Sequence, residues 1–335
     1  MKISPSSWAK IIVFIAVGIM FGGVMVLYSN SQFDNPSSDS PRDELRSMFG
    51  HDESSSTNRH IEKNFSVKSG GNLLLDTDAG DVDIVTWDKE EVLVKVDIEG
   101  SDRRSDKFDV RFSESPDRIS IIGKANDNNF FKWDMGDLDV RFHVTVPKKF
   151  FIKANTSGGN MTLRDLDGDV RFETSGGNLT IDDVNGTVDI NTSGGNIDVR
   201  KIKGGLKGVT SGGNVHADEV AGGVNVETSG GEIELSGIDG NVHAETSGGS
   251  VMLKLIGDNK GVDIHSSGGD INIFVNDSIS ANLEASTSGG KVRCELPITV
   301  KGDMADDELR GKINGGGNVI RAETSGGDVR VKALK

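Results

Sequence analysis

Five aspartates supply the number of carboxylates that glycoside hydrolysis would need: Asp165, Asp167, Asp169, Asp182 and Asp183. Two carboxylates on either side of a glycosidic bond can act as general acid and as base or nucleophile. A sugar-cleaving groove usually also needs aromatic platforms, but from residue 156 onward the sequence has only Phe172 and Phe274 and no Trp or Tyr. We therefore interpret the aspartates as solvent-exposed turn residues and predict no catalytic residue.

Two patterns are related to calcium-binding loops. Some solenoids bind Ca²⁺ through a Gly-Gly-x-Gly-x-Asp nonapeptide, and this chain shares its nine-residue spacing. The position after each Gly-Gly pair includes Ser250 and Lys291, which an obligatory carboxylate cage would not accept. The segment 76–80 resembles the start of an EF-hand loop, but its twelfth position is Trp87 where a bidentate Glu is needed. The sequence therefore predicts no metal site and no cofactor.

The histidines and the single cysteine show no spacing typical of a catalytic or metal site. His216 and His243 fall in opposite halves of their repeats and His265 at another position, so we expect exposed, separate side chains. Cys294 excludes an intramolecular disulfide and a thiolate cluster, and we expect it to pack as a small apolar residue. Phosphate-binding loops, nucleophile elbows and dinucleotide fingerprints are absent from the sequence. We predict that the protein is not an enzyme.

An 18-residue repeat must position these side chains. Thr-Ser-Gly-Gly begins at Thr156, Thr174, Thr192, Thr210, Thr228 and Thr246, and looser copies begin at Ser266, Thr287 and Thr324. Each period has two nine-residue halves in which Gly precedes an apolar, polar, apolar alternation, as at Leu179 and Ile181. Alternate residues of a strand point to one face, and glycines allow the chain to turn. One period therefore predicts two strands and two turns.

The predicted fold is all-β: a parallel β-solenoid of about 18-residue coils, preceded by one N-terminal transmembrane helix. Equivalent strands of successive coils can stack about 4.8 Å apart with their backbone groups paired. Two halves favour two principal sheets, while a third short sheet or partly antiparallel pairing stays open. We interpret the Thr column and the column of Asn160, Asn178, Asn196 and Asn214 as structural ladders. Gly208 occupies an expected apolar position.

The N-terminal segment predicts where the protein resides. Ile11–Leu27 carries no charge and, with Trp8 and Tyr28 at its ends, approaches the roughly 20 residues of a membrane-spanning helix. Lys2 and Lys10 precede it, and the charges that follow are acidic or mixed, so the positive-inside rule puts the N-terminus in the cytoplasm. A cleaved signal peptide is the alternative, although its apolar core is usually only about 7 to 15 residues. We expect a single-pass inner-membrane protein whose C-terminal part is extracytoplasmic.

Five segments follow from these patterns: a cytoplasmic tail at 1–10, a transmembrane helix at 11–28, a disordered linker at 29–60, an irregular N-terminal part of the solenoid at 61–155, and the regular TSGG-repeat solenoid at 156–335. The linker is rich in Ser, Asp and Asn and buries too little apolar surface to offset its ordering entropy. The irregular part already contains the half-repeat, since Ser69–Asn72 and Thr77–Asp81 each precede alternating apolar residues.

The TSGG repeats, the lead-in Val144–Pro147 before Thr156–Asn160 and the predicted anchor carry a family resemblance. The chain resembles the bacterial putative-adhesin β-strand-repeat family of unknown function, and it is similar to toastrack-type and head-GIN-type envelope domains. The resemblance covers about residues 61–335. It implies an extracytoplasmic β-solenoid and provides no catalytic residue to transfer. The chain departs from the pattern at Pro297–Lys312, which interrupts the array.

Two segments outside the repeat are candidates for interaction. The segment 126–139 contains Phe130, Phe131 and Trp133, which form either an exposed recognition loop or, as we favour, a hydrophobic cap on one solenoid end. The segment 297–312 is acidic in its middle and is either a protruding loop or tolerated variation.

The sequence favours a noncatalytic, adhesin-like surface protein that makes weak, repeated contacts with envelope proteins or glycans. A scaffold or sensor partner in a cell-envelope stress system is the first alternative, and a polysaccharide-active enzyme is the least favoured one. The net charge of −15, from 37 basic and 52 acidic residues, excludes nucleic acid as a partner. The last predicted strand, Asp328–Lys332, ends in basic residues that resist the addition of further strands, so we expect a monomer.

Overall fold

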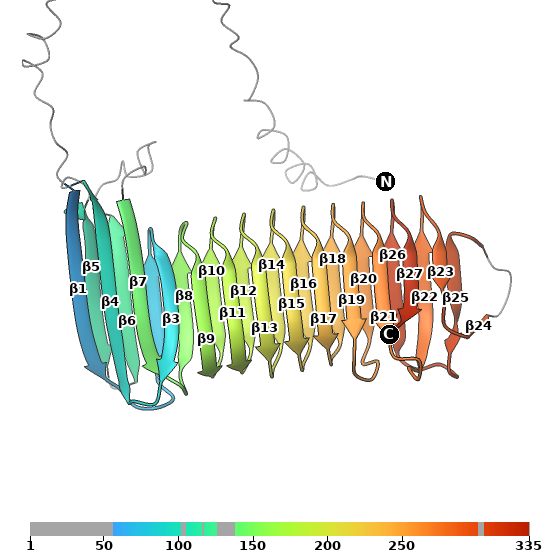
Figure 1. Cartoon of the computed structure of the whole chain (residues 1–335), viewed down its shortest axis with the longest axis horizontal. Helices are drawn as coiled ribbons and strands as arrows, with labels where there is room; N and C mark the ends of the chain where they lie inside the picture. Colours follow the sequence, from blue (N-terminus) through green and yellow to red (C-terminus); the bar gives the residue numbers. More distant parts are fainter. Residues whose placement is uncertain (1–55, 102–104, 116, 126–137, 301–304, 335) are drawn as a thin grey trace, which may run out of the picture. The chain divides into compact units, whose positions relative to one another are not determined.

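The computed structural model describes residues 56–101, 105–115, 117–125, 138–300 and 305–334. Within these residues the chain forms two long sheets (Figure 1). Sheet A has 13 strands, in spatial order β1 (Ser56–Ser66), β4 (Glu91–Ser101), β7 (Leu138–Pro147), β3 (Asp81–Trp87), β9 (Met161–Asp167), β11 (Leu179–Asn185), β13 (Ile197–Ile202), β15 (Val215–Val220), β17 (Ile233–Ile238), β19 (Val251–Leu255), β21 (Ile271–Val275), β27 (Val329–Ala333) and β23 (Val292–Cys294).

Sheet B has 14 strands, in spatial order β24 (Ile298–Val300), β25 (Glu308–Ile313), β22 (Ala281–Thr287), β26 (Val319–Thr324), β20 (Val262–Ser266), β18 (Val242–Thr246), β16 (Val224–Thr228), β14 (Leu206–Thr210), β12 (Val188–Thr192), β10 (Val170–Thr174), β8 (Phe151–Thr156), β2 (Asn72–Thr77), β6 (Arg118–Ala125) and β5 (Phe108–Ser115).

The middle of the molecule is a regular parallel solenoid. In sheet B, Val170 pairs with Val188, and in sheet A, Leu179 pairs with Ile197, so residues 18 apart in sequence lie side by side. Inward aliphatic residues from both sheets, such as Leu179 and Ile190, form one continuous buried core. The predicted all-β fold, its parallel 18-residue coils and its two principal sheets are confirmed.

Each regular coil buries a third residue in sheet A that simple alternation did not predict. Asp165, Asp183, Lys201 and Glu219 have left-handed φ angles of 55° to 58°. The pairing of β11 with β13 consequently passes from Asp182 and Arg200 directly to Val184 and Ile202. The chain therefore bends at this point and turns the following apolar side chain into the core, with exposed fractions of 0% for Val184 and Ile202.

Both ends of the solenoid depart from the sequential order of coils. The first coil, β2 with β3, lies between β6–β7 and β8–β9, and the last coil, β26 with β27, lies between β20–β21 and β22–β23. Antiparallel strands complete each end. At one end β1 pairs with β4, β4 with β7 and β5 with β6, and at the other β25 pairs with both β22 and β24. The antiparallel pairing left open by the repeat period therefore occurs, but at the ends.

Three expectations are affected by this arrangement. Strand β1 begins at Ser56, so residues 56–60, which were predicted to be part of the linker, belong to sheet A. Much of the 297–312 segment is strand, because β24 and the first part of β25 extend sheet B there. The predicted helix at 11–28 lies outside the described residues, within which no helix has the length and apolar character of a membrane span.

Candidate functional site

The aromatic segment that the sequence singled out lies outside the described residues. Phe130, Phe131 and Trp133 fall in the interval 126–137, between β6 and β7. Their assignment as an interaction loop or as an end cap therefore stays a prediction.

Four of the five candidate aspartates bond to neighbouring side chains. Three are acceptors toward the next coil: Asp167 from the Asn185 amide at 3.2 Å, Asp169 from the Thr187 hydroxyl at 2.8 Å, and Asp182 from the Arg200 guanidinium at 3.1 Å. Asp165 lies 2.8 Å from Lys148 Nζ. The repeat thus places these acids as links between coils.

The segment 76–80, which resembles the start of an EF-hand loop, forms ion pairs with a lysine. Lys124 Nζ lies 3.0 Å from Asp76 and 2.9 Å from Asp78. The hydroxyl of the buried Thr77 donates to the carbonyl of Ala79 at 2.7 Å, closing the turn between them. Within the described residues no group of three or more His, Cys, Asp and Glu side chains could hold a metal ion.

The Thr and Asn columns form ladders at the edge where the TSGG turns lead from sheet B into sheet A, which we call the TSGG edge. The buried Thr192 hydroxyl donates to Gly177 O of the preceding coil at 3.0 Å and accepts from Gly195 N at 3.2 Å. Asn178 Oδ1 accepts the backbone N–H of Asn196 at 2.8 Å. These side chains form hydrogen bonds to backbone groups of their own coil and of the neighbouring coil. The identical residues therefore stabilise the stacking of the coils.

Two histidines that were predicted to be separate contact the same carboxylate in sheet B. His243 Nδ1 lies 3.4 Å and His265 Nε2 lies 3.0 Å from Asp263, while His265 Nδ1 lies 3.5 Å from Glu323. The two histidines occupy different positions in the repeat, so the repeat alignment did not predict that both would contact Asp263. Cys294 is partly buried, and this burial raises the pKa of its thiol, which therefore stays protonated at neutral pH.

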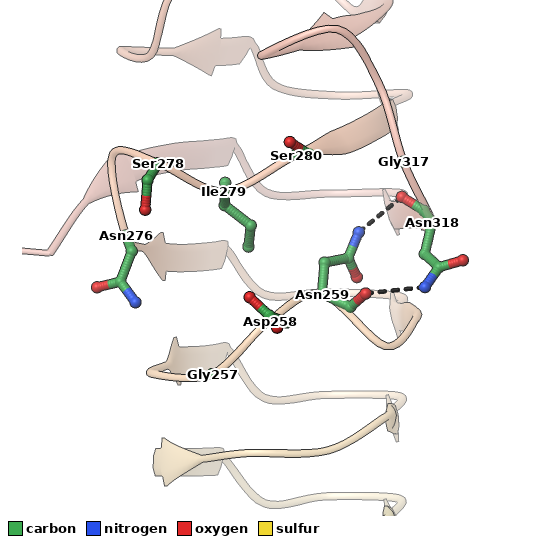
Figure 2. A pocket seen from close by; sticks show the side chains of 9 residues that line it. All are labelled: Gly257, Asp258, Asn259, Asn276, Ser278, Ile279, Ser280, Gly317 and Asn318. Carbon is green, nitrogen blue, oxygen red and sulfur yellow. Dashed lines mark hydrogen bonds between the residues drawn. The ribbon is translucent and has the colours of Figure 1, made fainter.

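The edge opposite the TSGG edge contains a polar cleft of about 400 Å³ (Figure 2). Three loops frame it, at 256–261, 276–280 and 314–318. On one side Asn259 Nδ2 donates to Asn318 O at 2.6 Å, and Asn318 Nδ2 donates to Asn259 O at 2.8 Å. On the other side Asn276 Nδ2 donates to Ile256 O at 2.8 Å. These bonds tie the walls of the cleft to the coils.

The cleft offers groups for noncovalent binding of a hydroxylated molecule. Asp258, Asn276 and Ser278 provide a carboxylate, a carboxamide and a hydroxyl around it. Such groups can donate to and accept from a polyol. This site was not predicted from the sequence. The sequence does contain one indication of the cleft: the interval between Thr246 and Ser266 is 20 residues, whereas the regular repeat has 18. The two extra residues enlarge the loop that carries Asn259.

Comparison with known proteins places the chain in a family. Residues 70–332 match the family described as Toastrack DUF4097. The chain belongs to the Toastrack DUF4097 family. The match begins with the half-repeat that leads into β2 and ends in β27, so it includes both interleaved ends of the solenoid as well as the regular array. Among the curated proteins compared, none matches this Toastrack chain.

Several solved structures are similar to this Toastrack solenoid. A putative adhesin from Bacteroides fragilis has 14% identity, covering 82% of this chain and 97% of its own, with a TM-score of 0.40. A putative lipid binding protein from Parabacteroides distasonis has 16% identity, covering 83% and 97%, with a TM-score of 0.43. A putative cell adhesion protein from Clostridium sporogenes has 13% identity, covering 83% and 100%, with a TM-score of 0.23.

Proposed function

We propose that this Toastrack protein is a noncatalytic, membrane-anchored extracytoplasmic solenoid that makes repeated, weak contacts with envelope glycans or proteins. The observation that carries the proposal is the in-register stacking of the coils. Residues Arg171, Asp189 and Lys207 lie in one row across three neighbouring strands, exposed or half-exposed on the outer face of sheet B. A face that repeats polar positions coil after coil can engage a repetitive ligand at several points, and linked weak contacts multiply in affinity.

The anchor in this proposal is the charge-free segment Ile11–Leu27, oriented by Lys2 and Lys10 on its cytoplasmic side. The acidic net charge of −15 keeps the exposed solenoid soluble and self-repelling, which favours a monomer. The partner is then another component of the envelope.

Two measurements test this function with the full-length protein in its membrane. Protease added to spheroplasts should cleave the region after residue 30 while an N-terminal tag stays protected, as the proposed orientation requires. Crosslinking in intact cells should then recover envelope glycan or surface proteins. Cleavage only after the cells are opened would contradict the orientation.

A further inference from the structure

A second cavity, of about 480 Å³, lies on the outer face of sheet B, and we call it the Phe151 groove. It crosses β6, β2, β8, β10 and β12. The strand register fixes its layout, because Asn72 pairs with both Arg118 and Phe151, and Lys153 pairs with both Leu74 and Arg171. The groove therefore collects side chains that are far apart in sequence but lie on neighbouring strands.

The apolar surface that the Phe151 groove offers to a ligand is small. Phe151 is 42% exposed and Leu74 is half-buried, whereas Leu73, Ile152 and Val170 are 1%, 3% and 2% exposed because their side chains point into the core. One aromatic ring and one aliphatic side chain match the C–H face of a single sugar ring. An acyl chain would need a longer apolar channel to leave water.

Some charged side chains in the Phe151 groove have side-chain partners and others have none among the described residues. Arg171 donates to Glu173 at 2.8 Å, and Asp169 accepts the Thr187 hydroxyl at 2.8 Å. Arg118 and Lys153, in contrast, make no side-chain ion pair with any residue that the structure describes. Three cations, Arg118, Lys153 and Arg171, line the groove against two carboxylates, Asp169 and Asp189, so the local charge favours a ligand that is itself anionic.

The groove also provides groups for hydroxyl recognition. Asn72 donates its amide to Asp117 O at 3.2 Å, which leaves its Oδ1 available as an acceptor. Asp169 uses Oδ1 toward Thr187, so its other carboxylate oxygen can accept from a sugar hydroxyl. A carboxylated sugar combines the three properties that the groove addresses: an apolar ring face, hydroxyl groups and a negative charge.

We propose that the Phe151 groove binds anionic sugar units, of the hexuronic acid class, in an envelope glycan. Phe151 stacks on the sugar ring, Arg118 and Lys153 bind its carboxylate, and Asn72 with Asp169 bind its hydroxyls. The assignment rests on the proposed function, for which it names the ligand class of one surface.

Calorimetric titration of the full-length protein in detergent tests the assignment, with trigalacturonate and its neutral methyl ester as probes. The acid should bind and the ester should bind at least about tenfold more weakly, since hydrogen bonds to charged groups contribute about 1.5 to 3 kcal/mol. Arg118→Gln, Lys153→Gln and Phe151→Ser should each weaken binding of the acid by about tenfold. Arg164→Gln removes an exposed cation on sheet A, away from the groove, and should leave binding unchanged.

Equal binding of acid and ester, absence of binding, or unchanged affinity in the three groove variants would overturn the assignment. So would anionic phospholipid vesicles that bind through Arg118 and Lys153 when trigalacturonate does not. Retention of isolated envelope material separates the two proposals. If the wild-type protein retains that material but does not bind trigalacturonate, the groove assignment fails and the proposed function stands. If it retains none, the proposed function fails.

Discussion

The two edges of the solenoid differ in how much the length of their loops varies. At the TSGG edge a Cβ atom on Gly177, Gly195 or Gly213 would lie 1.9 to 2.0 Å from the carbonyl oxygen of the preceding coil. The opposite edge has its own closely packed glycines, such as Gly204, but it also accepts larger loops, including the one that carries Asn259. Identical residues in this array therefore mark close backbone packing, whereas the cleft forms where the period changes.

Adding one methyl group at the TSGG edge should have the largest effect on stability. In Gly195→Ala the new Cβ would lie 1.9 Å from Gly177 O, so the backbones must separate, and we expect a loss of about 3 kcal/mol or more. Gly194→Ala is the matched control, because its Cβ would meet nothing closer than Ser175 O at 3.8 Å. Chemical unfolding followed by circular dichroism compares them, and equal midpoints would contradict the role of close packing.

Removing one ladder hydroxyl should have the next largest effect. Thr192→Val leaves Gly177 O and Gly195 N without the buried side-chain partner, which should cost about 1 to 3 kcal/mol. Thr192→Ser should retain most of the stability, because Ser266 already makes both equivalent bonds, at 2.9 and 3.0 Å. The same unfolding measurement applies, and a Ser variant as unstable as the Val variant would show that the methyl group matters as much as the hydroxyl.

The left-handed column that leads toward the opposite edge should respond to backbone preference. Lys201 has a φ of 55°, a conformation that β-branched residues resist and Asn tolerates. Lys201→Val should therefore lower the free energy of unfolding by about 1 kcal/mol relative to Lys201→Asn. Thermal unfolding of the two variants provides the comparison. No difference between them would mean that the strand bends without requiring this angle.

The smallest expected effect concerns pH at the interleaved C-terminal coil. A backbone hydrogen bond from Asp328 and the guanidinium of Arg330 lower the pKa of Asp270 below its ordinary 3.8. Because the folded-state pKa is the lower one, the stabilisation is present above about pH 3.8 and is lost as the pH falls through the folded-state value.

Asp270→Asn keeps an oxygen acceptor but removes the titration. Its unfolding midpoint should consequently depend less on pH between about 5 and 2 than that of the wild-type protein. Asp258→Asn, at the cleft, is the control for the loss of one carboxylate. Identical pH profiles for the Asp270 variant and the wild-type protein would contradict the assignment.

Much of the regular array could be predicted from the sequence alone. The 18-residue period and the alternation of Leu179 with Ile181 determine which side chains face the core, because side chains of a strand alternate between its faces. The third inward residue, Val184, could not be predicted in this way, since it depends on the left-handed angle at Asp183. The Asn259 cleft left a signal only in the altered period, and the Phe151 groove left none, because Arg118 and Phe151 are 33 positions apart in the sequence.

The all-β class, the two strands of each coil and the Thr and Asn ladders are encoded locally, because they follow from alternation along each strand and from a fixed repeat. The order of coils at the two ends depends instead on long-range packing. Thr324 lies between Ser266 and Thr287, although Thr287 is the next repeat along the chain. Local preference does not determine this order, because many segments share the same strand pattern and could pair equally well. The choice among them depends on how strands far apart in sequence cover the exposed ends of the core.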